Sequence, residues 1–187
     1  AFVAVADDYN SIFYNPAGLA RLKTWDFEIL NLQLVLSAEA RDLLSEVGDI
    51  KSSTDSIDLI ENNSGENQYF AMGITPHFVM RNFGFAIGIE SSASAIFHRD
   101  ISVDIKAGAE VVVPIGMAMN FLDERLSVGI NIKNRIVAFV DQTFSMDALD
   151  ALGGSGENSL EDYIYSGKGI GADLGVLFTP TQTMEPT

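Results

Sequence analysis

The sequence predicts an all-β fold, a transmembrane antiparallel β-barrel whose first strands follow a short N-terminal plug segment. Three observations predict it. Apolar and polar residues alternate with a period of two from Trp25 onward, short turns alternate with long acidic connections, and the polar phase of the strands holds mainly small residues. We therefore divide the chain into a plug segment over residues 1–24 and barrel strands over residues 25–187.

The opening segment, residues 4–19, is rich in small and turn-forming residues and leads directly into the alternating sequence. It is too interrupted to be a strand, so we expect it to pack against a surface that the strands build. Four of its residues are suited to capping short helices or fixing a turn, namely Asp7, Asp8, Asn10 and Pro16. A movable plug and a static plug need the same residues, so both hypotheses stay open.

The period-two alternation defines the strands. In residues 125–136 every second residue is apolar except Asn134, and the residues between them are polar or glycine. In residues 25–36 the alternation changes phase at Ile29 and Leu30, which predicts a β-bulge. We expect six strands, near residues 25–37, 69–80, 83–97, 102–121, 125–140 and 163–179.

The connections between these strands alternate between short and long. Tight turns are expected at residues 81–82, 122–124 and 179–183, and longer connections at residues 38–68, 98–101 and 141–162. Aromatic residues gather near the strand ends. Short turns at one end, long polar loops at the other and aromatic girdles are features of outer-membrane barrels, whose strands cross the bilayer with about 9–11 residues.

A soluble β-sandwich or lipocalin-like barrel also alternates and is the alternative fold. Its outward phase would carry many charges, whereas the polar phase here is dominated by Gly, Ala, Ser and Asn, which suit the inside of a barrel that holds a plug or a ligand. Six strands cannot close a bacterial single-chain barrel, which has about eight strands or more. We therefore expect an N-terminal portion of a longer barrel, without its signal peptide.

Negative charge is concentrated in two of the long connections. Residues 38–68 hold eight acidic residues against two basic ones, and residues 141–162 hold six and none, so these loops supply most of the net charge of −15. Such a chain does not fit a nucleic-acid partner, which needs clustered Lys and Arg. The sequence has no cysteine, no catalytic motif and no metal-ligand spacing around His77 or His98, so we expect no enzyme, metal or cofactor.

Two stretches resemble a known family. Ala6-Asp7-Asp8 followed by Asn15-Pro16-Ala17-Gly18-Leu19 is similar to the N-terminal hatch of the FadL/OmpP1/TodX family, and residues 171–181 look like its mid-barrel strand and turn. The resemblance implies a protein of the bacterial outer membrane. It also implies passive transport of long-chain fatty acids or other hydrophobic compounds through a plugged barrel. The hatch residues that it implies are Asp7, Asp8, Asn15, Pro16, Ala17 and Gly18.

Related PorV-like and TraF-like branches share the opening motif, which leaves a second function open. A non-transporting barrel would act as the scaffold or anchor of a secretion or surface assembly. In that case a protein partner would bind the acidic loops at residues 38–68 and 141–162. The same loops could bridge divalent cations to lipopolysaccharide or simply be solvated.

The polar phase offers candidate ligand-binding residues for the lumen, namely Glu110, Asn120, Asn131, Lys133, Arg135 and Asp173. Lys133 and Arg135 could bind a fatty-acid carboxylate through charge-assisted hydrogen bonds. They could instead form ion pairs with Glu110, Asp173 or the acidic residues of the plug. The sequence leaves both alternatives open.

Overall fold

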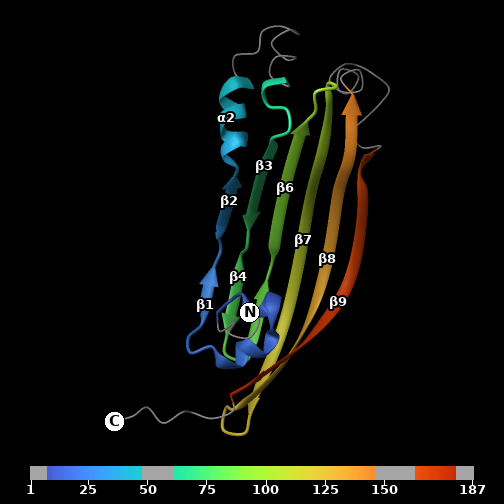
Figure 1. The fold of residues 1–187 in the computed structure, drawn as a ribbon. Coiled ribbons are helices and arrows are strands. Elements are labelled where there is room, and N and C mark those ends of the chain that lie inside the picture. The colour runs from blue at the N-terminus through green and yellow to red at the C-terminus, as the bar shows by residue number, and fades with distance from the viewer. Residues whose placement is uncertain (1–7, 48–60, 146–162, 180–187) are drawn as a thin grey trace.

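The computed structural model describes residues 8–47, 61–145 and 163–179, whose strands form one antiparallel sheet curled into a half-barrel (Figure 1). The strands are β1 (Asp26–Glu28), β2 (Leu32–Leu36), β3 (Asn67–Ile74), β4 (His77–Met80), β5 (Phe83–Ala86), β6 (Gly88–Phe97), β7 (Ser102–Phe121), β8 (Leu126–Ser145) and β9 (Tyr165–Phe178). The helices include α1 (Ser11–Tyr14), the 3₁₀ helix η2 (Pro16–Arg21) and α2 (Ala38–Val47). The prediction of an all-β antiparallel fold is confirmed. Among the described helices, none has the length and apolarity to cross a membrane.

Each of the first three expected strands is interrupted once, which gives the pairs β1 and β2, β3 and β4, and β5 and β6. The interruptions lie side by side: Thr75 N donates to Asn31 O (3.0 Å), and Ile87 N donates to Pro76 O (2.9 Å). Pro76 has no N–H to give to a neighbouring strand, so the regular ladder stops there. The break between β1 and β2 falls at the predicted phase change, and the chain has one more residue between Glu28 and Leu32 than between their partners Ile74 and His77.

The sheet is a meander. When each interrupted pair is counted as one strand, every strand pairs with the strands that precede and follow it in sequence. Two expected tight turns are present: Asn82 has a φ of 72°, and residues 122–124 have φ values of 55°, 54° and 67°. The second turn contains one more residue than expected, because Phe121 pairs with Leu126. The third, residues 179–183, lies almost entirely outside the described residues. We call the end of the sheet that carries these turns the turn end, and the opposite end the loop end.

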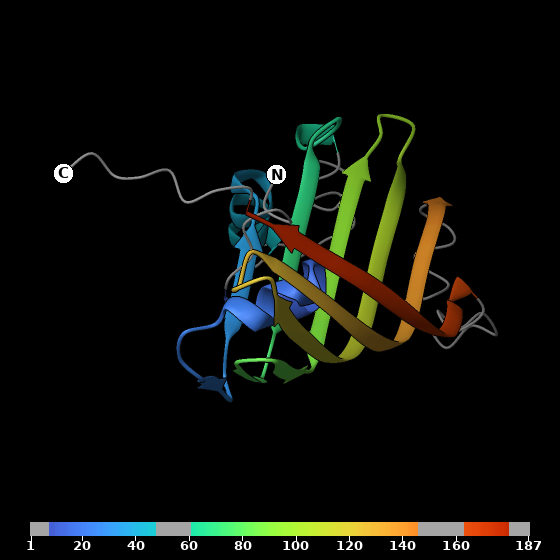
Figure 2. The ribbon, with the colours of Figure 1, turned by 90° about the horizontal axis from the view of Figure 1, so that it is seen from below.

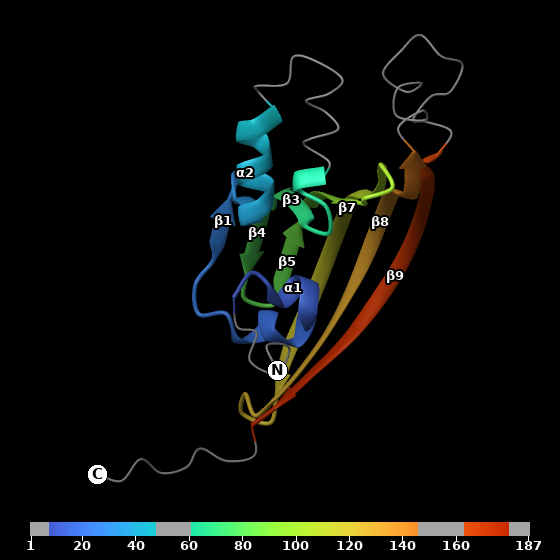
Figure 3. The ribbon, with the colours of Figure 1, turned by 45° about the horizontal axis from the view of Figure 1, so that its top comes forward.

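The long connections differ from the prediction in two places. β8 continues to Ser145 because it stays paired with β7 as far as Ser102. In addition, α2 occupies the beginning of the 38–68 connection, where the Ser37 hydroxyl accepts a hydrogen bond from Ala40 N (3.0 Å) and caps the helix. Figure 3 shows α2 at the loop end and α1 at the turn end. The remaining parts of the acidic loops, residues 48–60 and 146–162, lie outside the described residues.

Cross-strand pairing separates the side chains onto two faces of the sheet. The outer tiers across β7, β8 and β9 are Ile115–Ile132–Ala172, Met117–Ile130–Leu174, Met119–Val128–Val176 and Phe121–Leu126–Phe178. The concave tiers are Gly116–Asn131–Asp173, Ala118–Gly129–Gly175 and Asn120–Ser127–Leu177. The large apolar side chains of the outer tiers are mostly exposed, whereas the concave side chains are mainly small or polar.

Candidate functional site: the concave face and the N-terminal segment

The N-terminal segment, residues 8–22, lies inside the curl of the sheet near the turn end (Figure 2). Its 3₁₀ helix η2 contacts β7, β8 and β9. Ile12 and Leu19 of the segment are fully buried against Val79, Ala86 and Ala118 of the sheet. The apolar core of the described residues therefore lies between this segment and the concave face.

Glycines on three strands form the surface on which the segment lies. Gly129 of β8 and Gly175 of β9 are direct cross-strand partners. A Cβ atom on Gly129 would lie 2.5 Å from Ala17 N, and one on Gly175 would lie 2.8 Å from the same nitrogen. On β7, a Cβ atom on Gly116 would lie 3.1 Å from the Leu19 side chain. Glycine at these positions lets the backbone of the segment approach the strands closely.

The Asn-Pro-Ala-Gly motif builds the turn that fits this surface. Asn15 caps η2, since its Oδ1 accepts a hydrogen bond from Ala17 N (3.2 Å), and Pro16 occupies the first position of that helix. Gly18 N donates to Asn15 O (3.0 Å), and the whole motif is buried. The motif therefore fixes the turn between α1 and η2, as expected for Pro16.

Ahead of the motif, Asp8 forms hydrogen bonds with Asn10 and Ser11. Asp8 accepts hydrogen bonds from the backbone N (3.0 Å) and the side-chain amide (3.1 Å) of Asn10, and its own carbonyl accepts from Ser11 Oγ (2.7 Å). Asn10 stands at the N-cap of α1 but its side chain makes no capping bond, so that prediction was wrong. Asp7 lies outside the described residues.

Polar side chains of the sheet bind the carbonyl groups that the short helices leave free. Asn131 Nδ2 donates to Ile12 O (2.6 Å), and Lys133 Nζ donates to Phe13 O (2.7 Å). Near the turn end, Asn120 Nδ2 donates to Ala20 O (2.8 Å). Three of the candidate lumen residues therefore hold the N-terminal segment through hydrogen bonds to its backbone.

The two candidate cations of the lumen both form ion pairs. Lys133 pairs with Asp173, while Arg135 makes two hydrogen bonds with Glu110, Nε to Oε1 (2.6 Å) and Nη2 to Oε2 (2.7 Å). In each pair, the acidic residue lies two positions along its strand from the residue directly opposite the cation. Of the two alternatives left open by the sequence, ion pairing within the concave face is the one that the structure has.

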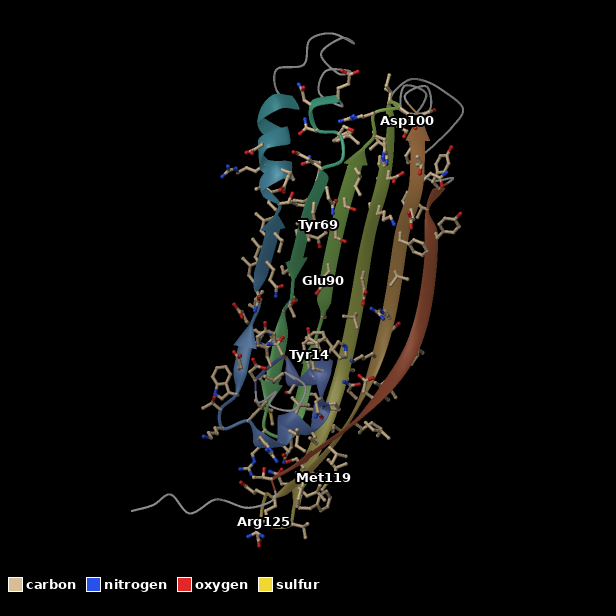
Figure 4. All side chains as sticks on the ribbon, in the orientation of Figure 1. Tyr14, Tyr69, Glu90, Asp100, Met119 and Arg125 are labelled. Atoms are coloured by element: carbon tan, nitrogen blue, oxygen red, sulfur yellow. The ribbon has the colours of Figure 1, made fainter. Side chains whose placement is uncertain are left out.

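Two hollows lie one above the other on the concave face. The upper hollow, about 460 Å³, is lined by Tyr69 and Phe139 and by small residues such as Gly73 and Gly108. The lower hollow, about 600 Å³, lies above α1 and is lined by Tyr14 together with the charged residues of both ion pairs. In Figure 4, Tyr69, Glu90 and Tyr14 follow one another from the loop end toward the turn end.

Glu90 is a functional candidate that sequence analysis missed. It lies directly opposite Glu110 in the pairing of β6 with β7, and both carboxylates line both hollows. With Glu110 paired to Arg135, the five charged side chains that line the lower hollow carry a net negative charge. In the alternating stretch 83–90, Glu90 is the last residue of the polar phase, and this position was the sequence signal that could have identified it.

Both histidines have ordinary partners. The His77 ring stacks on Tyr9 with centroids 4.1 Å apart, and its Nε2 lies 3.4 Å from Asp26 Oδ2. Near the loop end, His98 Nε2 lies 2.9 Å from Asp104 Oδ2. Across residues 8–47, 61–145 and 163–179, no group of three or more His, Asp or Glu side chains is arranged to bind a metal ion.

The connection between β6 and β7 contains a second residue with a polar partner, Asp100. The Ser102 hydroxyl donates to Asp100 Oδ1 (2.7 Å), and this hydrogen bond lowers the pKa of Asp100 below its ordinary value.

No protein-family model, curated protein or solved structure matches this chain. The resemblance to hydrophobic-compound transporters therefore rests on the opening motif and on residues 171–181, and it stays a prediction.

Proposed function

We propose that this chain forms part of a β-barrel in the bacterial outer membrane, with the outer tiers of β7, β8 and β9 in contact with lipid. The observation that supports this most strongly is the separation of the two faces. Mostly exposed Ile, Met, Leu, Val and Phe side chains fill the outer tiers, and the concave tiers hold mainly Gly, Asn and Ser, with Asp173, Ala118 and Leu177. β7 and β8 each have 20 residues, more than the roughly 9–11 that cross a bilayer.

In this proposal the N-terminal segment is the plug of the barrel. The glycine surface against which it packs and its hydrogen bonds to Asn131, Lys133 and Asn120 favour this role. The segment would close the lumen near the turn end, below the lower hollow. A ligand entering from the loop end would meet the upper hollow, then Glu90 and Glu110, then the lower hollow.

The proposed ligand is a hydrophobic compound that diffuses through the barrel without an energy source. Aromatic and small side chains in the upper hollow suit an apolar ligand. Long-chain fatty acids belong to the class that the opening motif implies. Their carboxylate would have to displace Glu110 from Arg135 or Asp173 from Lys133, so the ion pairs favour uncharged compounds over fatty acids.

Releasing Arg135 should change the ligand preference. We expect Glu110→Gln to raise the affinity for palmitate by about 10- to 150-fold, because a charge-assisted hydrogen bond contributes about 1.5–3 kcal/mol, while the affinity for an uncharged naphthalene probe stays the same. The measurement is fluorescence displacement on the full-length protein in detergent. Glu66→Gln, an exposed position outside both hollows, is the matched control.

The outcomes of this experiment separate the proposed function from its alternative. Binding of the probe by the parent protein supports a ligand-bearing lumen. A parent that binds neither probe nor palmitate would favour the scaffold hypothesis, in which a protein partner or lipopolysaccharide meets the acidic loops. If Glu110→Gln left the affinity for palmitate unchanged, Arg135 would not be part of the ligand site.

A further inference from the structure

A basic hollow lies at the turn end, on the far side of the N-terminal segment from the two hollows described above. Its volume is about 490 Å³, and its lining includes four cationic side chains, Arg21, Lys23, Arg81 and Arg125. Only two acidic residues, Asp123 and Glu124, line it. Four of the eleven Lys and Arg of a chain with a net charge of −15 therefore meet in one place.

The four cations differ in their partners. Arg81 forms an ion pair with Glu124, and Arg21 donates from Nε to Ser127 Oγ (3.2 Å) and from Nη2 to Thr179 Oγ1 (3.0 Å). Arg21 is thereby tied to β8 and to Thr179, and Arg81 to the turn between β7 and β8. Lys23 and Arg125 are exposed, and neither side chain has a hydrogen bond or ion pair with another described residue. Within the described residues, two cations of the hollow therefore lack a polar partner and the other two have one.

Each chain segment that supplies a cation also supplies an exposed apolar side chain within four residues, and these apolar side chains lie outside the lining of the hollow. Trp25 follows Lys23 and is 69% exposed, Leu122 precedes Arg125 and is 65% exposed, and Met80 precedes Arg81 and is 43% exposed. The outermost apolar tier, with Phe121 and Phe178, ends at the same turns. A soluble anion would need only the cations. Basic side chains at the end of a lipid-facing apolar surface suit the headgroup and the chains of an anionic lipid.

We propose that this turn-end hollow binds the phosphate of an anionic phospholipid of the adjacent membrane leaflet, with Lys23 and Arg125 as its ligands and Arg21 beside them. The proposal rests on the membrane location proposed above. Because Arg21 belongs to η2, a bound phosphate would also contact the N-terminal segment. Lipid binding and the position of that segment would then be linked.

Trp25, the single tryptophan of residues 1–187, reports on the lipid, and any tryptophan elsewhere in the full-length protein is replaced by phenylalanine. Full-length protein is reconstituted in phosphatidylcholine bilayers that contain either brominated phosphatidylglycerol or brominated phosphatidylcholine at the same fraction. We expect stronger quenching of Trp25 by the anionic lipid, with a relative affinity that falls about fivefold for each of Lys23→Gln and Arg125→Gln, since a basic residue near an anionic surface contributes about 1 kcal/mol. Arg99→Gln, an exposed position in the connection between β6 and β7 at the opposite end of the sheet, is the control and should change nothing.

The other results would overturn the proposal in distinguishable ways. Equal quenching by the two brominated lipids, unchanged in the variants, would contradict the phosphate site while leaving the membrane location supported. Loss of the preference on adding inorganic phosphate, but not chloride at equal ionic strength, would assign the hollow to a soluble anion instead. The absence of quenching by either lipid would contradict the membrane location itself, and the lipid site with it.

Discussion

Gly129→Ala should displace the N-terminal segment from the concave face. A Cβ atom at this position would lie 2.5 Å from Ala17 N, a backbone atom that cannot rotate away as a side chain can. Overpacking of this kind costs about 1–3 kcal/mol, so we expect a buried residue of the segment to become accessible about 5 to 150 times more often.

Cysteine labelling measures this effect, because residues 1–187 contain no cysteine and any cysteine elsewhere in the full-length protein is replaced by serine. Ser11 is fully buried in α1 and differs from cysteine by one atom, so Ser11→Cys provides the reporter. We expect slow maleimide labelling in the parent background and fast labelling in the Gly129→Ala background. Gly171→Ala on β9 is the matched control, since its Cβ would meet nothing within 4 Å. Equal labelling rates in the Gly129→Ala and Gly171→Ala backgrounds would show that the segment does not lie on the glycine surface.

Asn131→Ala should have the second large effect, through hydrogen bonds rather than packing. The Asn131 side chain is 1% exposed, donates to Ile12 O (2.6 Å) and accepts from Asp173 N (3.3 Å). Its removal leaves the carbonyl of a fully buried residue without this partner, which costs about 1–3 kcal/mol. We expect faster Ser11→Cys labelling and a lower midpoint of urea unfolding.

The control for this experiment is on the same strand. Asn134 is exposed on the outer face of β8, opposite Val113 and Ile170, so Asn134→Ala removes an amide of the same size without touching the segment. We expect unchanged labelling and unchanged or slightly higher stability in a bilayer. If Asn131→Ala labelled no faster than Asn134→Ala, the hydrogen bond to Ile12 would not contribute to seating the segment.

The strands could be predicted from the sequence because one face of each is apolar over many residues. In β8 the alternation runs from Leu126 to Ile136 with Asn134 as its only exception, and it defines both the strand and its outer face. The interruptions were harder to foresee, since only Pro76 and the phase change near Ile29 signal them. α2 was missed because its sequence is acidic and weakly apolar, and its cap, Ser37, follows directly from a strand.

The contacts within the site depend on register, which the sequence determines only in part. With three turn residues after Phe121, apolar residues of β7 would oppose polar residues of β8. The observed fourth residue, Arg125, pairs Phe121 with Leu126 and brings Glu110 beside Arg135. β8 and β9 are joined by a long connection, so no turn fixes their register from sequence. The pair of Lys133 with Asp173 was therefore one of several possibilities.

The most direct test of the proposed plugged barrel is heat-modifiable gel mobility of the full-length protein after membrane fractionation. We expect the protein in the outer-membrane fraction, with an unheated form that migrates faster than the boiled one, because a closed barrel keeps its compact fold in detergent. A protein found in the soluble fraction, with one mobility before and after boiling, would contradict the membrane barrel and the functions proposed for it.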